Sequence, residues 1–110
     1  MPKWSFIRDG DGKIAGIDFR LGANPTTSAV CVFDSRESAE HFVAFFQAAE
    51  RPGARECEIE EHTADESVRL LGGVQAERGW QYFWVNPIPG SNYGEQTNLH
   101  RISRAASVLS

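Results

Sequence analysis

The chain has 110 residues, a size that fits one domain and allows a hydrophobic core without disulfide or metal support. Hydrophobic residues make up 41% and charged residues 24% of it, so global disorder is not expected, and the apolar runs are too short for a transmembrane helix. The formal net charge of -4 argues against a protein that binds nucleic acid by neutralising phosphates.

Two further observations bear on location. The first residues lack the apolar core of a secretion signal. The two cysteines are too few for a disulfide framework, so a reducing environment fits best. We therefore expect a cytoplasmic protein without a membrane partner.

The first third of the chain is expected to form three strands. Residues 4–7 form the first, and an Asp-Gly turn over residues 9–12 leads into the second at residues 14–21, where apolar and polar side chains alternate. Residues 29–33 are apolar at every position, which is typical of a strand covered on both faces and central in its sheet. Because the links are short, these strands are expected to form an antiparallel meander.

The next segment predicts a helix and a short strand. Asp34 and Ser35 are both good N-caps for a helix with one apolar stripe that ends near residue 50. Residues 56–62 then alternate as a strand with an acidic face, which suits a sheet edge. Six acidic side chains and no Lys or Arg lie between residues 56 and 66, which indicates a solvated acidic edge or a docking surface for a basic partner.

A second helix follows directly. Thr63 and Glu66 have the spacing of a capping box, and Gly79 is a typical C-terminal stop. Two glycines in the middle of this helix, Gly72 and Gly73, disfavour helical structure and indicate close packing on a neighbour or a kink.

The strongest strand signal, residues 80–85, comes next, and prolines close it. Residues 93–110 then carry a formal charge of +1, against -5 for residues 1–92, with apolar side chains at helical spacing. We predict one α+β domain over residues 1–92: a mostly antiparallel sheet of about five strands, in the order β-β-β-α-β-α-β, with two helices packed on one face. Residues 93–110 form a tail that is a short amphipathic helix or orders only on a partner.

No pattern for a cofactor or catalytic nucleophile meets its spacing requirement. Cys57 and His62 would need two more metal ligands, with Cys31 and His41 as the other candidates, so buried thiols and surface histidines are favoured over a metal site. Cys31 lies in an apolar strand that disfavours its thiolate. We expect no metal and no cofactor, and a non-enzymatic function is favoured over an enzyme.

Aromatic residues concentrate on two of the predicted strands, and alternation places them on one face of each. One interpretation is that these rings belong to the ordinary core. If both helices lie on one side of the sheet, however, some of the rings are left on the open side, where the tail, a second copy or a partner would cover them. The leading hypothesis is a protein–protein interaction module, with a homodimer as the expected form. Its interface residues would be Trp4, Phe6, Trp80, Tyr82, Trp84, Leu99, Arg101 and Ile102.

Two alternatives stay open. One is a ligand-binding protein or small enzyme, with a pocket between the sheet and the Pro87–Gly94 loop and with Glu60, His62 and Tyr93 as polar groups. The other is RNA stacking on the aromatic face, against which the acidic composition weighs. Nucleic acid is therefore not the expected partner.

Three short motifs resemble the N-terminal domain of SseB-type bacterial proteins. These are the apolar strand that leads through Phe33-Asp34-Ser35 into a helix, the pair Leu70-Leu71, and the aromatic strand that closes on Asn86-Pro87. The resemblance covers roughly residues 28–90 and implies a bacterial protein with a small fold of sheet and helices. It implies no catalytic residue, and the segment from residue 90 to residue 110 has no counterpart in it.

Overall fold

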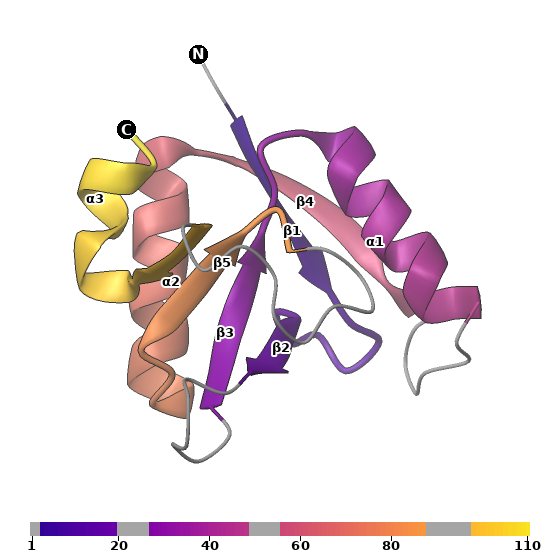
Figure 1. Ribbon diagram of the computed structural model, residues 1–110, viewed down its shortest axis with the longest axis horizontal. Coiled ribbons are helices and arrows are strands. Elements are labelled where there is room, and N and C mark those ends of the chain that lie inside the picture. Colours follow the sequence, from indigo (N-terminus) through magenta and orange to yellow (C-terminus); the bar gives the residue numbers. More distant parts are fainter. Residues whose placement is uncertain (1–2, 20–26, 49–55, 88–97) are drawn as a thin grey trace.

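The structure of the chain, a computed structural model, describes residues 3–19, 27–48, 56–87 and 98–110 (Figure 1). These residues form one α+β domain, which confirms the predicted fold class. The strands are β1 (Lys3–Arg8), β2 (Gly16–Phe19), β3 (Thr27–Val32), β4 (Glu58–Thr63), β5 (Tyr82–Val85) and β6 (Leu99–Arg101). The helices are α1 (Arg36–Ala48), α2 (Ala64–Arg78), the short 3-10 helix η3 (Ile102–Arg104) and α3 (Ala105–Val108).

Strand β3 is the centre of the fold. It pairs antiparallel with β2 and parallel with β5, and β6 pairs antiparallel with the other side of β5, which gives the strand order β2-β3-β5-β6. Ala29, Val30, Cys31 and Val32 are all fully buried. The prediction of a central strand covered on both faces is therefore confirmed.

Strand β1 does not join the predicted meander. It forms a separate antiparallel pair with β4, from Lys3 opposite Thr63 to Arg8 opposite Glu58. Its links to the larger sheet are two isolated bridges, one of them between Ser5 and Phe33. The ladder with β4 satisfies more backbone groups of β1 than the four-residue strand β2 could. Of the three strands expected in the meander, only β2 and β3 therefore pair with each other.

The two long helices pack on opposite faces, which corrects the expectation that both lie on one face (Figure 1). Residues of α1 pack with Cys31 and Phe33, whereas residues of α2 pack with Val30 and Val32. Successive residues of a strand point to opposite sides, so these two clusters lie on different faces of β3. A strand that is apolar on both faces needs a cover on each.

Capping explains where the helices begin. The capping box of α2 is present: the Glu66 amide donates to Thr63 Oγ1 at 3.2 Å, and the Thr63 amide donates to Glu66 Oε1 at 2.9 Å. Gly79 ends the helix in the left-handed conformation with a φ of 71°. At the start of α1, Ser35 rather than Asp34 accepts a backbone bond, from the Ser38 amide at 3.2 Å.

The described part of the C-terminal segment belongs to the same core. Strand β6 extends the sheet, and η3 and α3 bring Ile102, Ala105 and Leu109 into the cluster on the α2 face. Trp4 Nε1 donates a hydrogen bond to the Leu109 carbonyl at 2.9 Å, so the two ends of the domain are joined. Within the described residues of this segment, helical structure comprises η3 and α3, and residues 93–97 lie outside the described part.

No helix within the described ranges is long and apolar enough to cross a membrane.

Candidate functional site

Two of the five aromatic residues nominated for an interface, Phe6 and Trp84, are buried in the core, as is the nominated Ile102. Phe6 is 0%, Trp84 3% and Ile102 6% exposed. Trp80 packs with the cluster on the α2 face, whereas Tyr82 and Trp84 pack with Ala29 on the other face. Strand β5 begins only at Tyr82, so the expected alternation does not extend back to Trp80.

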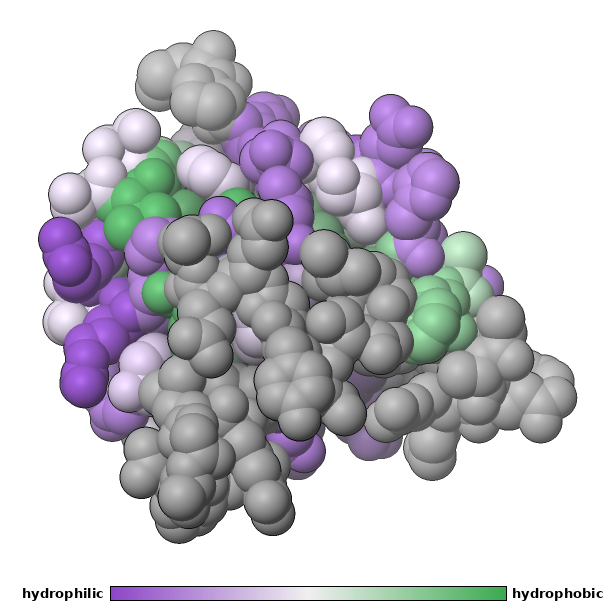
Figure 2. Space-filling view, viewed as in Figure 1, coloured by the Kyte–Doolittle hydropathy of each residue, from purple (hydrophilic) through white to green (hydrophobic). Residues whose placement is uncertain are grey.

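The rest of the nominated set is partly accessible. Trp4 and Leu99 are half-buried, and Arg101 is exposed with its guanidinium carbon 5.4 Å from the centre of the Tyr82 ring. Elsewhere, Figure 2 shows a hydrophobic area over the C-terminal part of α1, the helix that carries the exposed Phe45. Figure 2 also shows a hydrophobic area at the upper left, in the region of α3, with hydrophilic residues around it.

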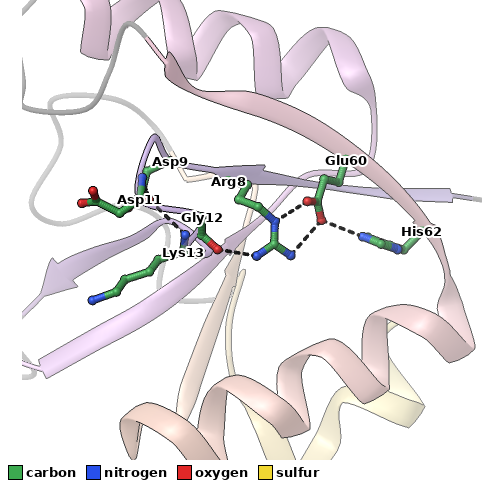
Figure 3. A network of polar contacts seen from close by, with 7 residues as sticks. All are labelled: Arg8, Asp9, Asp11, Gly12, Lys13, Glu60 and His62. Carbon is green, nitrogen blue, oxygen red and sulfur yellow. Dashed lines mark hydrogen bonds and ion pairs between the residues drawn. The ribbon is translucent and has the colours of Figure 1, made fainter.

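A polar network lies on the α2 side of the β1–β4 pair (Figure 3). The register places Phe6 opposite Glu60 and Trp4 opposite His62, so alternate residues of both strands share the face that holds Phe6. Arg8 continues this row on β1. The antiparallel ladder therefore brings Arg8, Glu60 and His62 together on the side that faces α2.

Four polar contacts and one ring contact hold the network. Arg8 Nε donates to Glu60 Oε1, and Arg8 Nη2 donates to Glu60 Oε2 at 3.2 Å, so the guanidinium binds both carboxylate oxygens. Arg8 Nη1 donates to the Gly12 carbonyl at 2.6 Å. His62 Nε2 lies 3.0 Å from Glu60 Oε2, and its ring packs edge-on against Phe6 with the ring centres 5.8 Å apart.

These contacts keep Glu60 ionised. The hydrogen bond from Arg8 is the main cause that lowers the pKa of Glu60. Burial raises this pKa, but by less than the Arg8 bond lowers it, and the hydrogen bond with His62 lowers it further. The same pairing raises the pKa of Arg8. Glu60, expected as part of a solvated acidic edge, is instead a structural carboxylate that orients its neighbours.

The turn after β1 places a lysine beside this network. Asp9 Oδ1 accepts hydrogen bonds from the Asp11 amide at 2.9 Å and the Lys13 amide at 3.0 Å (Figure 3). Gly12 has a φ of 78°, in the left-handed region that favours glycine. The Asp-Gly turn expected from the sequence thus fixes the backbone that carries Lys13.

Between this turn and α2 lies an open groove of about 550 Å³. The strand side contributes Arg8, Gly12, Lys13, Ile14 and His62. The helix side consists of residues three and four apart, which share one face of α2. They are Glu66, Arg69, Leu70, Gly73, Val74, Glu77 and Arg78.

The groove is rich in positive charge for so acidic a chain. Within the described ranges, four of the eight Lys and Arg side chains line it, against two of the thirteen Asp and Glu side chains. One of those two, Glu66, keeps its negative charge, because the backbone hydrogen bond from Thr63 is the main cause that lowers its pKa and the charge of Arg69 lowers it further. The groove therefore has a local excess of cations.

The four cations differ in what they already bind. Arg8 is paired with Glu60, and Arg78 Nη1 donates to the Ile14 carbonyl at 3.1 Å while its guanidinium stacks 4.6 Å from the centre of the Trp80 ring. The side chains of Lys13 and Arg69 make no hydrogen bond or ion pair within the described part of the chain. Two cations of the groove thus keep their donors for another molecule.

Close packing on a neighbour does not explain the two glycines of α2. A Cβ at Gly72 or Gly73 would meet no atom within 4 Å in the described structure, so neighbour packing does not require glycine there. The helix also runs unbroken from Ala64 to Arg78. Gly73 lines the groove and Gly72 does not, so the absent side chain at Gly73 leaves the groove open.

The sequence identified part of this site. Glu60 and His62 are brought together as nominated, and His62 faces a groove, but that groove lies beside α2. Tyr93 and most of the Pro87–Gly94 loop lie outside the described residues. Sequence reasoning missed Arg8, Lys13 and Arg69. The available signal for Arg69 was its position four residues before a glycine, Gly73, on the same predicted helix face.

Cysteine and metal chemistry receive no support from the described residues. Burial raises the pKa of the Cys31 thiol, which disfavours the nucleophilic thiolate. No group of three His, Cys, Asp or Glu side chains in the described ranges is placed to hold a metal ion.

Comparison with known proteins adds no family. No family model matches the sequence, and no curated protein is significantly similar to it. The resemblance to SseB-type proteins stays a prediction.

Proposed function

We propose that this domain binds a small anionic molecule in the groove between α2 and the turn after β1. The observation that carries the proposal is that Lys13 and Arg69 line one concave surface while neither side chain is bound by the described residues. Exposed cations in a cleft raise the local concentration of anions and supply hydrogen-bond donors. The volume of about 550 Å³ lies in the range of small-molecule sites.

The polar network supports this role by positioning the groove wall. Glu60 neutralises Arg8 and fixes its guanidinium, and the third nitrogen of Arg8 holds the carbonyl of Gly12 beside Lys13. The wall is therefore assembled without a ligand, which lowers the ordering cost of binding. We assign binding rather than a reaction, and the cytoplasm as location, since Cys31 is a free buried thiol.

Isothermal titration calorimetry with phosphate, citrate and simple carboxylates tests the proposal. Lys13→Gln and Arg69→Gln should each weaken the binding of an anion about fivefold, the value of one exposed charge contact. Arg104→Gln removes an exposed arginine outside the groove and is the matched control. Equal affinities for the wild type, the two groove variants and the control would contradict the proposal.

A second candidate, self-association, is favoured by one observation at the other end of the sheet. In the described structure β6 pairs only with β5, and the exposed Arg101 lies over the Tyr82 ring beside this edge. Edge strands pair readily with other chains, and Arg and Tyr are enriched at interfaces. Light scattering on the wild type and Arg101→Glu should then show a dimer that the substitution dissociates; a monomer in both would refute this candidate.

A further inference from the structure

We propose that the groove takes an elongated small molecule with an acidic group at each end, and that this molecule crosses α2 at Gly73. The inference rests on the proposed anion-binding function and specifies the ligand class. Three features of the groove carry it: the separation of its cations, the apolar side chains between them, and the glycine at its middle.

Arg69 and Arg78 lie near the two ends of the helical wall of the groove, whereas Arg8 is already paired with Glu60. Arg69 and Arg78 are nine positions apart on one helix, which corresponds to about 13.5 Å along its axis. Arg78 donates to the carbonyl of Ile14, the residue after Lys13, so Lys13 belongs to the Arg78 end. Arg69 lies closer to the start of the helix, into which His62 leads. A compact ion such as phosphate would reach one end only.

Between Arg69 and Arg78, the helical wall of the groove carries two apolar side chains, Leu70 and Val74, together with Gly73 and Glu77. Ile14, Leu70 and Val74 line the groove, and Ile14 and Val74 are themselves nearly buried. Apolar side chains in this position favour an aliphatic or otherwise apolar ligand body over a continuous chain of charges. The groove thus matches a molecule whose acidic groups are separated by an apolar spacer.

Gly73 gives this molecule its path. It lies four residues after Arg69 and five before Arg78, which is near the middle of the cationic span. Glycine disfavours the helix relative to alanine, and no described neighbour excludes a side chain here. Glycine at position 73 therefore lowers the stability of the helix. We propose that it is present because it leaves an open passage for the ligand over the helix backbone.

Calorimetry with a length series of α,ω-dicarboxylates, from succinate through suberate to dodecanedioate, tests the two-ended ligand. Each is compared with the monocarboxylate of the same carbon number. We expect affinity to rise with length until both ends are reached, at which point the dicarboxylate should bind about fivefold more tightly than its monocarboxylate. Equal affinity of the two at every length would overturn the two-ended ligand while leaving anion binding in place. No binding of any of these anions would overturn both proposals.

Two leucine substitutions on the same helix test the path over Gly73. Gly73→Leu should fill the groove and weaken the best dicarboxylate by about tenfold or more, because binding loses contact along the whole body. Gly72→Leu adds the same side chain one position away, outside the groove, and should leave the affinity unchanged. Both should raise the melting temperature by about 4 °C, since leucine is the better helix former. If Gly73→Leu does not fold, Gly73→Ala replaces it; unchanged affinity in a folded Gly73 variant would overturn the proposed path.

Discussion

Arg8 and Glu60 bind each other diagonally across the β1–β4 ladder, although 52 positions separate them in the chain. The register sets Phe6 opposite Glu60 and Arg8 opposite Glu58, so the pair spans two rungs on one face. The remaining nitrogen of Arg8 binds the Gly12 carbonyl, and Glu60 also contacts His62. One ion pair therefore connects two strands, a turn and the wall of the groove.

Replacing Glu60 should make stability depend on pH in a specific way. Because the pKa of Glu60 in the folded protein lies below its ordinary value of 4.5, its ionised form stabilises the fold. Glu60→Gln should lower the free energy of unfolding by roughly 1 kcal/mol at neutral pH. The difference from the wild type should be constant above about pH 6 and vanish as the pH falls through the lowered pKa.

Urea unfolding between pH 3 and pH 7 measures this difference. Glu58→Gln, an exposed carboxylate on the same strand, is the matched control and should change little. A Glu60→Gln penalty that persists unchanged to pH 3 would show that the ion pair is not its source.

Removing the hydroxyl of Ser67 should stabilise the domain. Ser67 is fully buried in α2, and its Oγ atom has no hydrogen-bond partner within the described structure. Ser67→Ala removes this unsatisfied group and improves helix propensity, so unfolding should cost about 1 kcal/mol more. A lower melting temperature of the variant in calorimetry would show that the hydroxyl has a partner in solution.

The indole of Trp4 should hold the C-terminal segment in place. Its Nε1 donates to the Leu109 carbonyl at 2.9 Å, and the ring packs against the α2-face core. Trp4→Phe keeps an aromatic ring but loses the donor, which should cost about 1 kcal/mol. Hydrogen exchange in residues 105–110 should then be faster in the variant than in the wild type, whereas exchange in β3 should change less. Equal protection of residues 105–110 in the variant and the wild type would argue that the bond contributes nothing.

Neutralising Glu77 should strengthen anion binding. Glu77 lines the groove near Arg78 and opposes the positive charge there. Glu77→Gln should bind the same anion about twofold to fivefold more tightly, and the gain should shrink at high salt. The same titration on Glu37→Gln, an exposed carboxylate on α1, provides the control. A loss of affinity in Glu77→Gln would imply that the carboxylate itself contacts the ligand.

Local patterns predicted much of the fold. The capping box at Thr63, the stop at Gly79, the Asp-Gly turn and the buried central strand depend on neighbouring residues, and each is present. Long-range pairing was not predictable in the same way. The β1–β4 ladder and the parallel pairing of β3 with β5 join distant segments, and no local spacing specifies them.

The same distinction explains the candidate site. Glu60 and His62 could be nominated because they lie two residues apart on one strand, but the partner of Glu60 is Arg8, which only the β1–β4 register reveals. The burial of Phe6 and Trp84 was not predictable for a related reason. With a helix on each side of β3, and with the described C-terminal residues packed on the α2 face, Phe6 and Trp84 lie in the core.

The most direct test of the central claim is calorimetric titration of the wild type and Arg69→Gln with suberate at low ionic strength. We expect saturable binding by the wild type and about fivefold weaker binding by the variant, with an unchanged melting temperature in the absence of ligand. Equal affinity in the two proteins would contradict the assignment of the groove as an anion site, and absence of suberate binding would contradict the proposed ligand class.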